Sequence, residues 1–466
     1  MTLCVLKFGG TSVGTVAAMR STVERIASAA SPGPVVVVVS AFSGVTDDLA
    51  AAVLQAAQRD ARYRNVVFTL RQRTALLLSS IASGSHARQA EAHCAEHLQR
   101  LKELLDAVAL LRRCPEELHD EAMSLGERLC ASVVAAGVAT LDVPVERIDA
   151  GEIVRTDSTF GEAEIDFDLT SKAARSLVRG NGATIVPGFF GADRRGRTVL
   201  LGRGGSDTTA TVLGAALSAD RVEIWTDVDG VLTADPRHVP TARSLSALSY
   251  ADAAEAAFFG AKVLHPRALG PAAAARVPVT VRNSFAGGPG TRIDEGPSPE
   301  EAFTVALTAD VSLISRRPGA RALESLSAAA ARARVPVLLE QDRAMGESWV
   351  AIPATARARV TREMPFDTAF EGTAECTGMA IVAAIGPRAR ERSHLLIEIL
   401  SDPRLGPLVV VAGARRSALV ALLPVAAARG AVEALHRELA ERGRPVREPS
   451  SLFGPRGVWY DPAHAR

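Results

Sequence analysis

The sequence predicts an α/β protein with a mainly parallel sheet covered by helices, followed by a smaller α+β region. Strand-like and helix-like segments alternate over residues 1 to about 295, as in parallel sheets whose strands are joined by helices. Two weakly similar units then follow, each with the order strand, helix, strand, strand. The chain has 466 residues, too many for one compact core, so we expect two or three domains.

The strands of the first region are expected where short apolar runs occur. These runs cover residues 4–8, 35–40, 184–190, 198–201, 221–226 and 277–282. Apolar residues at helical spacing predict a helix over residues 16–30 and a second, long one that includes Leu98, Leu105 and Leu111. The first region therefore repeats the strand–helix alternation of a sheet covered on both faces.

The C-terminal part begins after a segment rich in Gly, Pro, Ser and Glu at residues 285–299, which indicates a domain edge. We expect helices over residues 320–333, 393–400 and 430–442. We expect strands at residues 335–340, 349–352, 379–385, 408–412 and 418–423. The resulting domains are residues 1–295, 300–372 and 373–446, with a tail at 447–466.

Charge and cysteine content exclude several classes of protein. The chain carries 53 basic and 52 acidic residues, a net charge of +1, so neither a nucleic-acid groove nor a polybasic membrane patch is expected. The five cysteines lack C-x-x-C spacing, which favours neither disulfides nor structural zinc. We expect no membrane-spanning segment, because no continuous apolar run reaches the length that a bilayer requires, and we therefore expect a cytoplasmic protein.

Two glycine-rich turns are the most informative local feature. KFGGTS (residues 7–12) and LGRGGSD (residues 201–207) each follow an apolar run and precede an alanine-rich stretch. Glycines allow backbone N–H groups to approach an anion, and a helix N-terminus adds partial positive charge. Lys7 and Arg203 add two cations that suit phosphate or carboxylate. The pair of turns predicts a polyphosphate site and hence a phosphate-transfer enzyme, although no P-loop motif is present.

Other interpretations of these turns remain open. Lys7 could be a surface lysine at a strand end, and Ser206 or Asp207 could simply cap the following helix. Asp207 could instead orient Lys7 or help to position a metal. A dinucleotide-binding turn would need glycine where Asp207 stands, and a carboxylate there would repel pyrophosphate.

Further candidate residues lie after the strand at residues 221–226. Asp227 could accept hydrogen bonds from a ribose or adenine group, and Arg237 could reach a phosphate. The neighbouring Asp-Gly and Asp-Pro pairs are also ordinary turn sequences. These residues therefore support a nucleotide site only in combination with the glycine-rich turns.

Two helical residues complete the candidate set. Glu127, inside an alanine-rich helix, could bind an ammonium group, although most helix glutamates are solvated. Lys262 could contact phosphates, or it could simply favour the C-terminal end of a helix dipole. His265 has no acidic or serine partner nearby in sequence, so a hydrolase triad is not predicted.

Taken together, the motifs resemble those of the aspartate kinases, a family of the amino-acid kinase superfamily. The matching segments are KFGGTSV (7–13), SAFSGVT (40–46), LGE (125–127), GFFG (188–191), LGRGGSD (201–207), WTDVDG (225–230), DPR (235–237), GAKVLHP (260–266) and VRN (281–283). They occur in the family order over essentially the whole of the first 295 residues. The resemblance implies an amino-acid kinase fold followed by two ferredoxin-like ACT domains.

The activity implied by this resemblance is transfer of the ATP γ-phosphoryl group to the β-carboxylate of L-aspartate. The product is 4-phospho-L-aspartate, from which lysine, threonine and methionine are made. An attacking carboxylate needs no general base, so positioning and cationic charge suffice. The resemblance also implies Mg²⁺ on the ATP phosphates, with no metal site built from the protein alone, and a homodimer or higher oligomer formed through the ACT-like domains.

The resemblance assigns roles to individual residues. The catalytic positions are Lys7, Arg203 and Asp207. The aspartate-binding positions are Thr46, Glu127, Arg203 and Ser206. The ATP-binding positions are Lys7, Gly9, Gly10, Thr226, Asp227, Arg237 and Lys262.

The C-terminal part departs from the family pattern at SRRPGA (315–320), EQD (340–342) and RARER (388–392). We therefore hypothesise that feedback inhibition by lysine or threonine is weakened and that the pathway served is a specialised one. Two alternatives remain: a paralogue that phosphorylates another carboxylic acid, and an inactive kinase fold that senses amino acids. Retention of Lys7, Arg203, Asp207 and Asp227 argues against the inactive fold.

Overall fold

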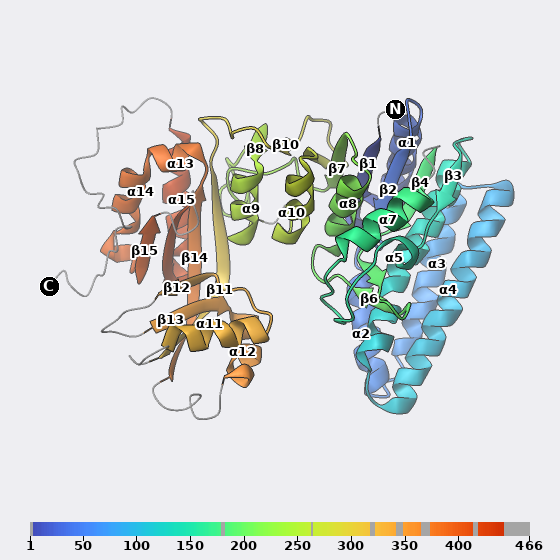
Figure 1. Cartoon of the computed structure of the whole chain (residues 1–466), viewed down its shortest axis with the longest axis horizontal. Helices are drawn as coiled ribbons and strands as arrows, with labels where there is room; N and C mark the ends of the chain where they lie inside the picture. Colours follow the sequence, from blue (N-terminus) through green and yellow to red (C-terminus); the bar gives the residue numbers. More distant parts are fainter. Residues whose placement is uncertain are drawn as a thin grey trace. The chain divides into compact units, whose positions relative to one another are not determined.

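The computed structural model describes residues 3–178, 182–261, 264–316, 322–341, 348–364, 373–412 and 418–441 (Figure 1). Their contacts divide the chain into two compact units. The N-terminal unit contains residues 1–231 and 263–296, and the C-terminal unit contains residues 232–262 and 297–466. The segment 232–262 thus belongs to the C-terminal unit by its contacts, while the domain boundaries drawn from the sequence stay a prediction.

The sheet of the N-terminal unit has the strand order β3-β4-β2-β1-β7-β9-β10. Its strands are β1 (Cys4–Phe8), β2 (Val35–Val39), β3 (Val145–Arg147), β4 (Ala183–Pro187), β7 (Arg221–Thr226), β9 (Val279–Asn283) and β10 (Thr291–Asp294). All neighbours are parallel except β10, which is antiparallel to β9. β1 and β2 are completely buried, as apolar strands at the centre of a parallel sheet must be. The predicted α/β class with a mainly parallel sheet is confirmed.

Helices surround this sheet (Figure 1). They are the short 3₁₀ helix η1 (Gly10–Val13) and α1 (Val16–Ala30), α2 (Val45–Ala57), α3 (Tyr63–Ile81), α4 (Gly84–Leu111), α5 (Glu116–Ala139), α6 (Ala150–Ile153), α7 (Phe167–Leu177), α8 (Gly205–Ala216) and α10 (Pro266–Ala275). A small antiparallel pair, β5 (Phe190–Ala192) and β6 (Thr198–Leu200), lies outside the main sheet. The expected strand at 184–190 is therefore two strands, because the chain turns at Gly188 and Phe189, which has a φ of 78°.

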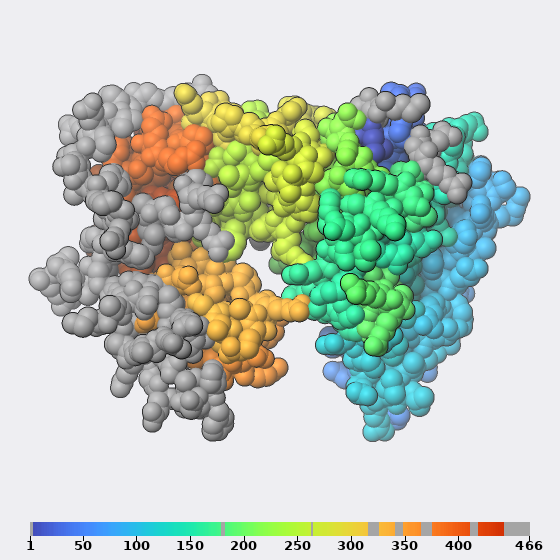
Figure 2. Space-filling view, in the orientation of Figure 1, coloured from blue at the N-terminus to red at the C-terminus, as the bar shows by residue number. Residues whose placement is uncertain are grey.

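Helix α5 is the central helix of this unit. By length and composition alone it could cross a membrane, although the sequence pattern suggested no such segment. In its most apolar stretch of 18 residues, 83% of the residues are buried inside the protein. The helix packs mainly against α4. Its apolar character is therefore explained by burial in a protein core. In contrast, α4 runs along the surface of the unit (Figure 2).

In the C-terminal unit, strands of the described residues form a sheet with the order β12-β13-β11-β14-β16-β15. The strands are β11 (Thr304–Arg316), β12 (Leu339–Gln341), β13 (Ser348–Pro353), β14 (Thr373–Ile385), β15 (Val409–Ala412) and β16 (Leu419–Pro424). The two long strands β11 and β14 pair antiparallel at the centre, with Thr304 opposite Ile385. The two predicted strand–helix–strand–strand units thus share one continuous sheet.

The helices of this unit are α9 (Tyr250–Phe258), α11 (Ala322–Arg332), α12 (Arg357–Glu363), α13 (Pro387–Glu391), α14 (Ser393–Leu400) and α15 (Val425–Ala440), with the 3₁₀ helices η2 (Ala354–Ala356) and η3 (Pro403–Leu405) and the short strand β8 (Ala247–Ser249). Helix α15 begins five residues before the predicted start at Gly430, because residues 426–428 are alanines that favour a helix. Phe259, just after α9, packs in one apolar cluster with residues of β11 and β14. This packing explains why segment 232–262 groups with the C-terminal unit.

Candidate active site

The candidate site lies at one edge of the N-terminal sheet. Strands β2, β1 and β7 are parallel and in register, with Val39, Phe8 and Trp225 aligned near their carboxyl ends. The glycine turn 9–14, the loop 40–46 and Thr226 therefore all begin at this edge. Such an edge is the usual ligand site of open parallel sheets.

Lys7 and Asp207 form the central ion pair of this edge. The Lys7 Nζ lies 2.7 Å from the Asp207 Oδ1, and the side chains are only 10% and 15% exposed. Lys7 comes from β1 and Asp207 from the first turn of α8. The interpretation of Lys7 as a surface lysine is therefore wrong. A buried pair of this kind holds the ammonium group in one place, since both charges have lost much of their water.

Helix α8 presents its N-terminus to the same edge. Its N-cap is Gly204, which has a φ of 73° and no side-chain cap, so the interpretation of Ser206 or Asp207 as the capping residue is wrong. A Cβ atom at Gly204 would lie 2.3 Å from the Cβ of His265, which leaves no room for a side chain. The N–H of Gly205 donates to the carbonyl oxygen of Gly202 at 3.0 Å. The N–H groups of Ser206 and Asp207 have no hydrogen-bond partner among the described residues, so these two are available to an anion.

The glycine turn after β1 is closely packed. A Cβ atom at Gly10 would lie 2.9 Å from the carbonyl oxygen of Ala41. The Gly9 N–H donates to the carbonyl of Trp225 at 3.0 Å, so this N–H group is occupied within the protein. A Cβ atom at Gly9 would lie 3.6 Å from the Lys7 Nζ. Gly9 and Gly10 therefore act by leaving space beside Lys7 and the loop 40–46.

Glu127 on α5 is buried and only partly hydrogen-bonded. The residue is 3% exposed, and its Oε1 accepts from the N–H of Ala41 at 3.1 Å. Its Oε2 is buried and has no hydrogen-bond partner in the part of the chain that the structure describes. Burial raises the pKa of Glu127 from 4.5 to about 8. A cationic ligand group beside Oε2 would supply the missing partner and favour the carboxylate.

Three further predicted residues differ in their exposure. Thr46, the second residue of α2, is half-buried, and Ser206 in the first turn of α8 is 8% exposed. Arg203, just before the N-cap of α8, is exposed. Its side chain has no hydrogen bond or ion pair to another residue that the structure describes, so its guanidinium can bind a ligand.

The nucleotide-binding candidates are only partly brought to this edge. The Thr226 hydroxyl donates to Asp227 at 3.1 Å, and both follow β7. Arg237 belongs to the C-terminal unit, where its side chain pairs with Asp235. Lys262 lies outside the described residues.

Asp120 is a residue of this region that the sequence analysis missed. It is 1% exposed, and its Oδ2 accepts from the N–H groups of Gly161 at 2.7 Å and Leu200 at 2.9 Å. Leu200 ends β6, three residues before Arg203. The hydrogen bond from the Leu200 N–H to Asp120 therefore fixes the start of the loop that connects β6 to α8 and contains Arg203. Asp120 precedes Glu127 by seven residues, two turns of α5, and this spacing on one helix face could have revealed it.

Within the described part of the chain, no group of three or more His, Cys, Asp or Glu side chains is close enough to hold a metal ion.

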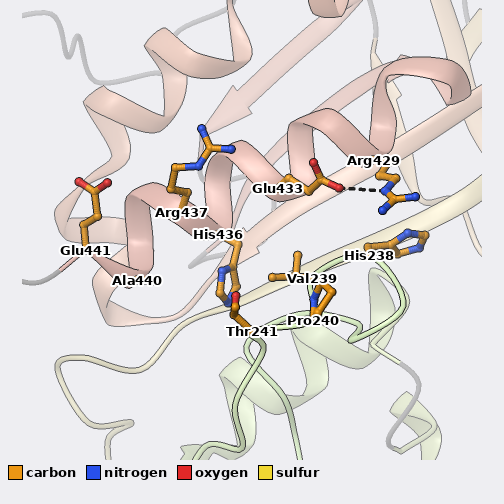
Figure 3. A pocket seen from close by; sticks show the side chains of 10 residues that line it. All are labelled: His238, Val239, Pro240, Thr241, Arg429, Glu433, His436, Arg437, Ala440 and Glu441. Carbon is orange, nitrogen blue, oxygen red and sulfur yellow. Dashed lines mark hydrogen bonds and ion pairs between the residues drawn. The ribbon is translucent and has the colours of Figure 1, made fainter.

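A separate cavity of about 440 Å³ lies in the C-terminal unit between residues 238–241 and α15 (Figure 3). Arg429 donates to Glu433 at 2.8 Å on its rim. His436 points towards Thr241 and is hydrogen-bonded to the Thr233 hydroxyl at 2.9 Å. None of the predicted site residues lines this cavity.

Comparison with known proteins identifies the family. Residues 2–283 match the model described as "Amino acid kinase family". The chain belongs to the amino acid kinase family. The resemblance to aspartate kinases is confirmed, because similar curated proteins are aspartokinases.

Named relatives cover the N-terminal part of the chain. The chain is 38% identical over 293 residues to lysine-sensitive aspartokinase 3 of Escherichia coli, covering 60% of this chain and 62% of that protein. It is 35% identical to the chloroplastic aspartokinase 3 of Arabidopsis thaliana, over 60% of this chain and 51% of that protein. The matches thus span about half to three-fifths of the relatives' length.

Solved structures match over more of the chain. Escherichia coli aspartokinase III in complex with aspartate and ADP matches with a TM-score of 0.80 and 29% identity, covering 94% of this chain and 100% of that one. The same protein in complex with lysine and aspartate matches with a TM-score of 0.73 and 28% identity, with the same coverage. The predicted fold, a kinase sheet followed by an ACT-like sheet region, agrees with these matches.

Proposed function

We propose that this protein is an aspartate kinase, which transfers the γ-phosphoryl group of ATP to the β-carboxylate of L-aspartate. The buried ion pair of Lys7 and Asp207 beside the N-terminus of α8 carries this proposal. A fixed cation thus lies beside the N–H groups of Ser206 and Asp207, which have no partner among the described residues and could bind a phosphoryl group. The similarity to an aspartokinase solved with aspartate and ADP supports the same substrates for this chain.

The chemistry requires positioning and charge stabilisation. The aspartate carboxylate is itself the nucleophile, so no residue needs to remove a proton. Negative charge on the transferred phosphoryl oxygens would be stabilised by the Lys7 ammonium and by the N–H groups of Ser206 and Asp207. Asp207 would orient the ammonium, because it lies 2.7 Å away and is itself held in the first helical turn.

The residues around this pair suit an α-amino acid. Arg203, exposed and without a described partner, would bind the α-carboxylate through two parallel hydrogen bonds. The free Oε2 of Glu127 would accept from the α-ammonium. The hydroxyls of Thr46 and Ser206 would complete the aspartate site.

The nucleotide would lie along the ends of β1 and β7. Thr226 and Asp227 would bind the nucleoside, while Lys7 would bind the phosphates beside Gly9 and Gly10. For Arg237 and Lys262 the ATP-binding role that the resemblance assigns stays a prediction. Mg²⁺ would bridge the phosphates and neutralise their charge.

Assembly, location and regulation are part of the same proposal. We expect a homodimer or higher oligomer formed through the sheet of the C-terminal unit. The five free cysteines favour a reducing, cytoplasmic location. We also propose weakened feedback inhibition by lysine or threonine. Of the segments that support this hypothesis, residues 317–320 and 342 lie outside the described residues.

A hydroxamate assay tests the activity. The protein is incubated with ATP, Mg²⁺ and hydroxylamine, and with L-aspartate, D-aspartate or L-glutamate. Hydroxamate from L-aspartate alone supports the proposal. Product from another carboxylic acid alone would favour the paralogue, and ATP binding without any product would favour an amino-acid sensor. Inhibition by millimolar lysine or threonine, alone or together, would contradict weakened feedback.

A further inference from the structure

Arg73 joins two loops of the candidate site, although it lies on α3, which supplies none of the predicted site residues. Its Nη1 donates to the carbonyl oxygen of Ser43 at 2.8 Å. Its Nη2 donates to the carbonyl oxygen of Gly14 at 3.0 Å. The first carbonyl belongs to the loop before α2, and the second ends the glycine turn after β1.

The two loops also touch each other directly. The Ser43 N–H donates to the carbonyl of Gly10 at 3.1 Å. The guanidinium of Arg73 lies 5.6 Å from the ring centre of Phe42, which is 1% exposed. The guanidinium is therefore held on one side by a fixed aromatic ring and bridges two backbone segments that already meet.

An arginine suits this position for a geometric reason. The planar guanidinium carries two Nη groups in a rigid fork, so one side chain can satisfy two carbonyls with a fixed spacing. Lysine offers a single ammonium on a flexible chain and would bind one carbonyl well at a time. The distance between the two loops is therefore set by Arg73 more strictly than by loop contacts alone.

We propose that Arg73 is a positioning residue for phosphoryl transfer, a role that rests on the proposed function. Arg73 fixes the glycine turn beside Lys7 relative to the loop that leads into α2, where Thr46 lies. ATP phosphates would lie beside the first segment and aspartate beside the second. Arg73 touches neither substrate in this account, and it acts by setting the separation of the two reacting groups. Misplacement of such groups by about 1 Å can cost up to about a hundredfold in rate.

The test compares Arg73→Ala and Arg73→Lys with the matched control Arg71→Ala. Arg71 lies two residues earlier on α3, is exposed, and makes no hydrogen bond or ion pair with any other described residue. We expect Arg73→Ala to lower kcat about ten- to a hundredfold while KM for each substrate changes less than about threefold. Arg73→Lys should recover part of the lost kcat, and Arg71→Ala should leave kcat unchanged.

Amide hydrogen exchange without substrates gives an independent measurement. We expect faster exchange in residues 10–14 and 41–46 of Arg73→Ala, with the rest of the protein unchanged. Equal kcat values for Arg73→Ala and Arg71→Ala, or a loss of stability with kcat retained, would overturn the proposal. If the wild type makes no aspartyl phosphate, the proposed function fails, and hydrogen exchange alone then shows whether Arg73 fixes the loops.

Discussion

A buried carboxylate at the candidate site and a buried ion pair of the C-terminal unit differ in how they are partnered. At the edge of the N-terminal sheet, the Oε2 of Glu127 is buried with no hydrogen-bond partner among the described residues. In the C-terminal unit, Arg392 donates to Glu438 at 2.8 Å and His436 is bonded to Thr233. An unpartnered buried group is costly unless a ligand completes it, whereas a paired one stabilises the fold. We therefore expect catalysis to depend on the Glu127 region of the first unit, and we expect Arg392 and Glu438 to stabilise the fold of the second unit.

The largest effect should come from removing the Lys7 ammonium. We expect Lys7→Ala to lower kcat about a thousandfold, because a fixed cation beside the phosphoryl group is lost. Steady-state kinetics with the hydroxamate assay measures this. Lys172→Ala, at an exposed lysine of α7, is the control and should behave like the wild type. Nearly full activity of Lys7→Ala would contradict the expectation that catalysis depends on this edge of the N-terminal sheet.

Removing a buried charge from the C-terminal unit should affect stability and not catalysis. The side chains of Arg392 and Glu438 are 4% and 12% exposed. We expect Arg392→Ala to lower the free energy of unfolding by about 3 kcal/mol, because Glu438 would be left buried without its partner. Urea denaturation measures this loss, and kcat of the folded fraction should stay within about twofold of the wild type. A large fall in kcat with unchanged stability would contradict the structural role expected for Arg392.

Glu127 should connect pH to both stability and aspartate binding. Its pKa is raised from 4.5 to about 8, so the folded protein keeps a proton that the unfolded chain releases between these values. The free energy of unfolding should therefore fall as pH rises from about 4.5 to about 8. Denaturation of the ligand-free protein across this range measures the slope, which Glu127→Gln should reduce.

The same carboxyl group should release its proton when aspartate binds. Below pH 8 the substrate ammonium would favour ionised Glu127, so close to one proton should leave at neutral pH. Calorimetry in buffers of different ionisation enthalpy counts these protons. Glu127→Gln should release none and raise KM for aspartate about a hundredfold, the loss expected for a charged hydrogen bond. Unchanged proton release in this variant would remove Glu127 from the aspartate site.

The smallest effects should come from a matched pair of glycine substitutions. Gly204→Ala forces an alanine to a φ of 73° against His265 and should cost about 1–2 kcal/mol of stability and lower kcat. Gly430→Ala, within α15, meets no atom within 4 Å and should stabilise the protein by about 0.5–1 kcal/mol. Thermal unfolding and kcat of both variants measure the difference. An equal response would mean that the α8 turn is not specially constrained.

The sequence predicted the central strands of the N-terminal sheet because they are marked locally, but it missed the short strands β3 and β10, and β10 lies in the segment predicted to be a domain edge. Short, continuous apolar runs predict buried strands, as at residues 4–8 and 35–39. Glycine-rich turns mark where such strands end. The pairing of β11 with β14, some seventy residues apart, depends on contacts that no local pattern encodes. The same holds for the grouping of residues 232–262 with the C-terminal unit.

The candidate site was predictable only where residues form motifs. Lys7, Ser206 and Asp207 lie in glycine-rich segments that indicate a ligand. Arg73 and Asp120 lie in ordinary helices, and their importance appears only in the hydrogen bonds they donate or accept across the fold. Long-range hydrogen bonds to backbone groups have no sequence signature, so only a structure reveals them.

Chemical trapping of the product tests the central claim most directly. The enzyme is given carbon-labelled L-aspartate, ATP and Mg²⁺, and the product is reduced with borohydride. An acyl phosphate on the β-carboxylate becomes homoserine, whereas one on the α-carboxylate becomes 3-amino-4-hydroxybutyrate. We predict labelled homoserine from the wild type and almost none from Lys7→Ala. Labelled 3-amino-4-hydroxybutyrate, or the absence of any labelled alcohol while ATP still binds, would contradict the account.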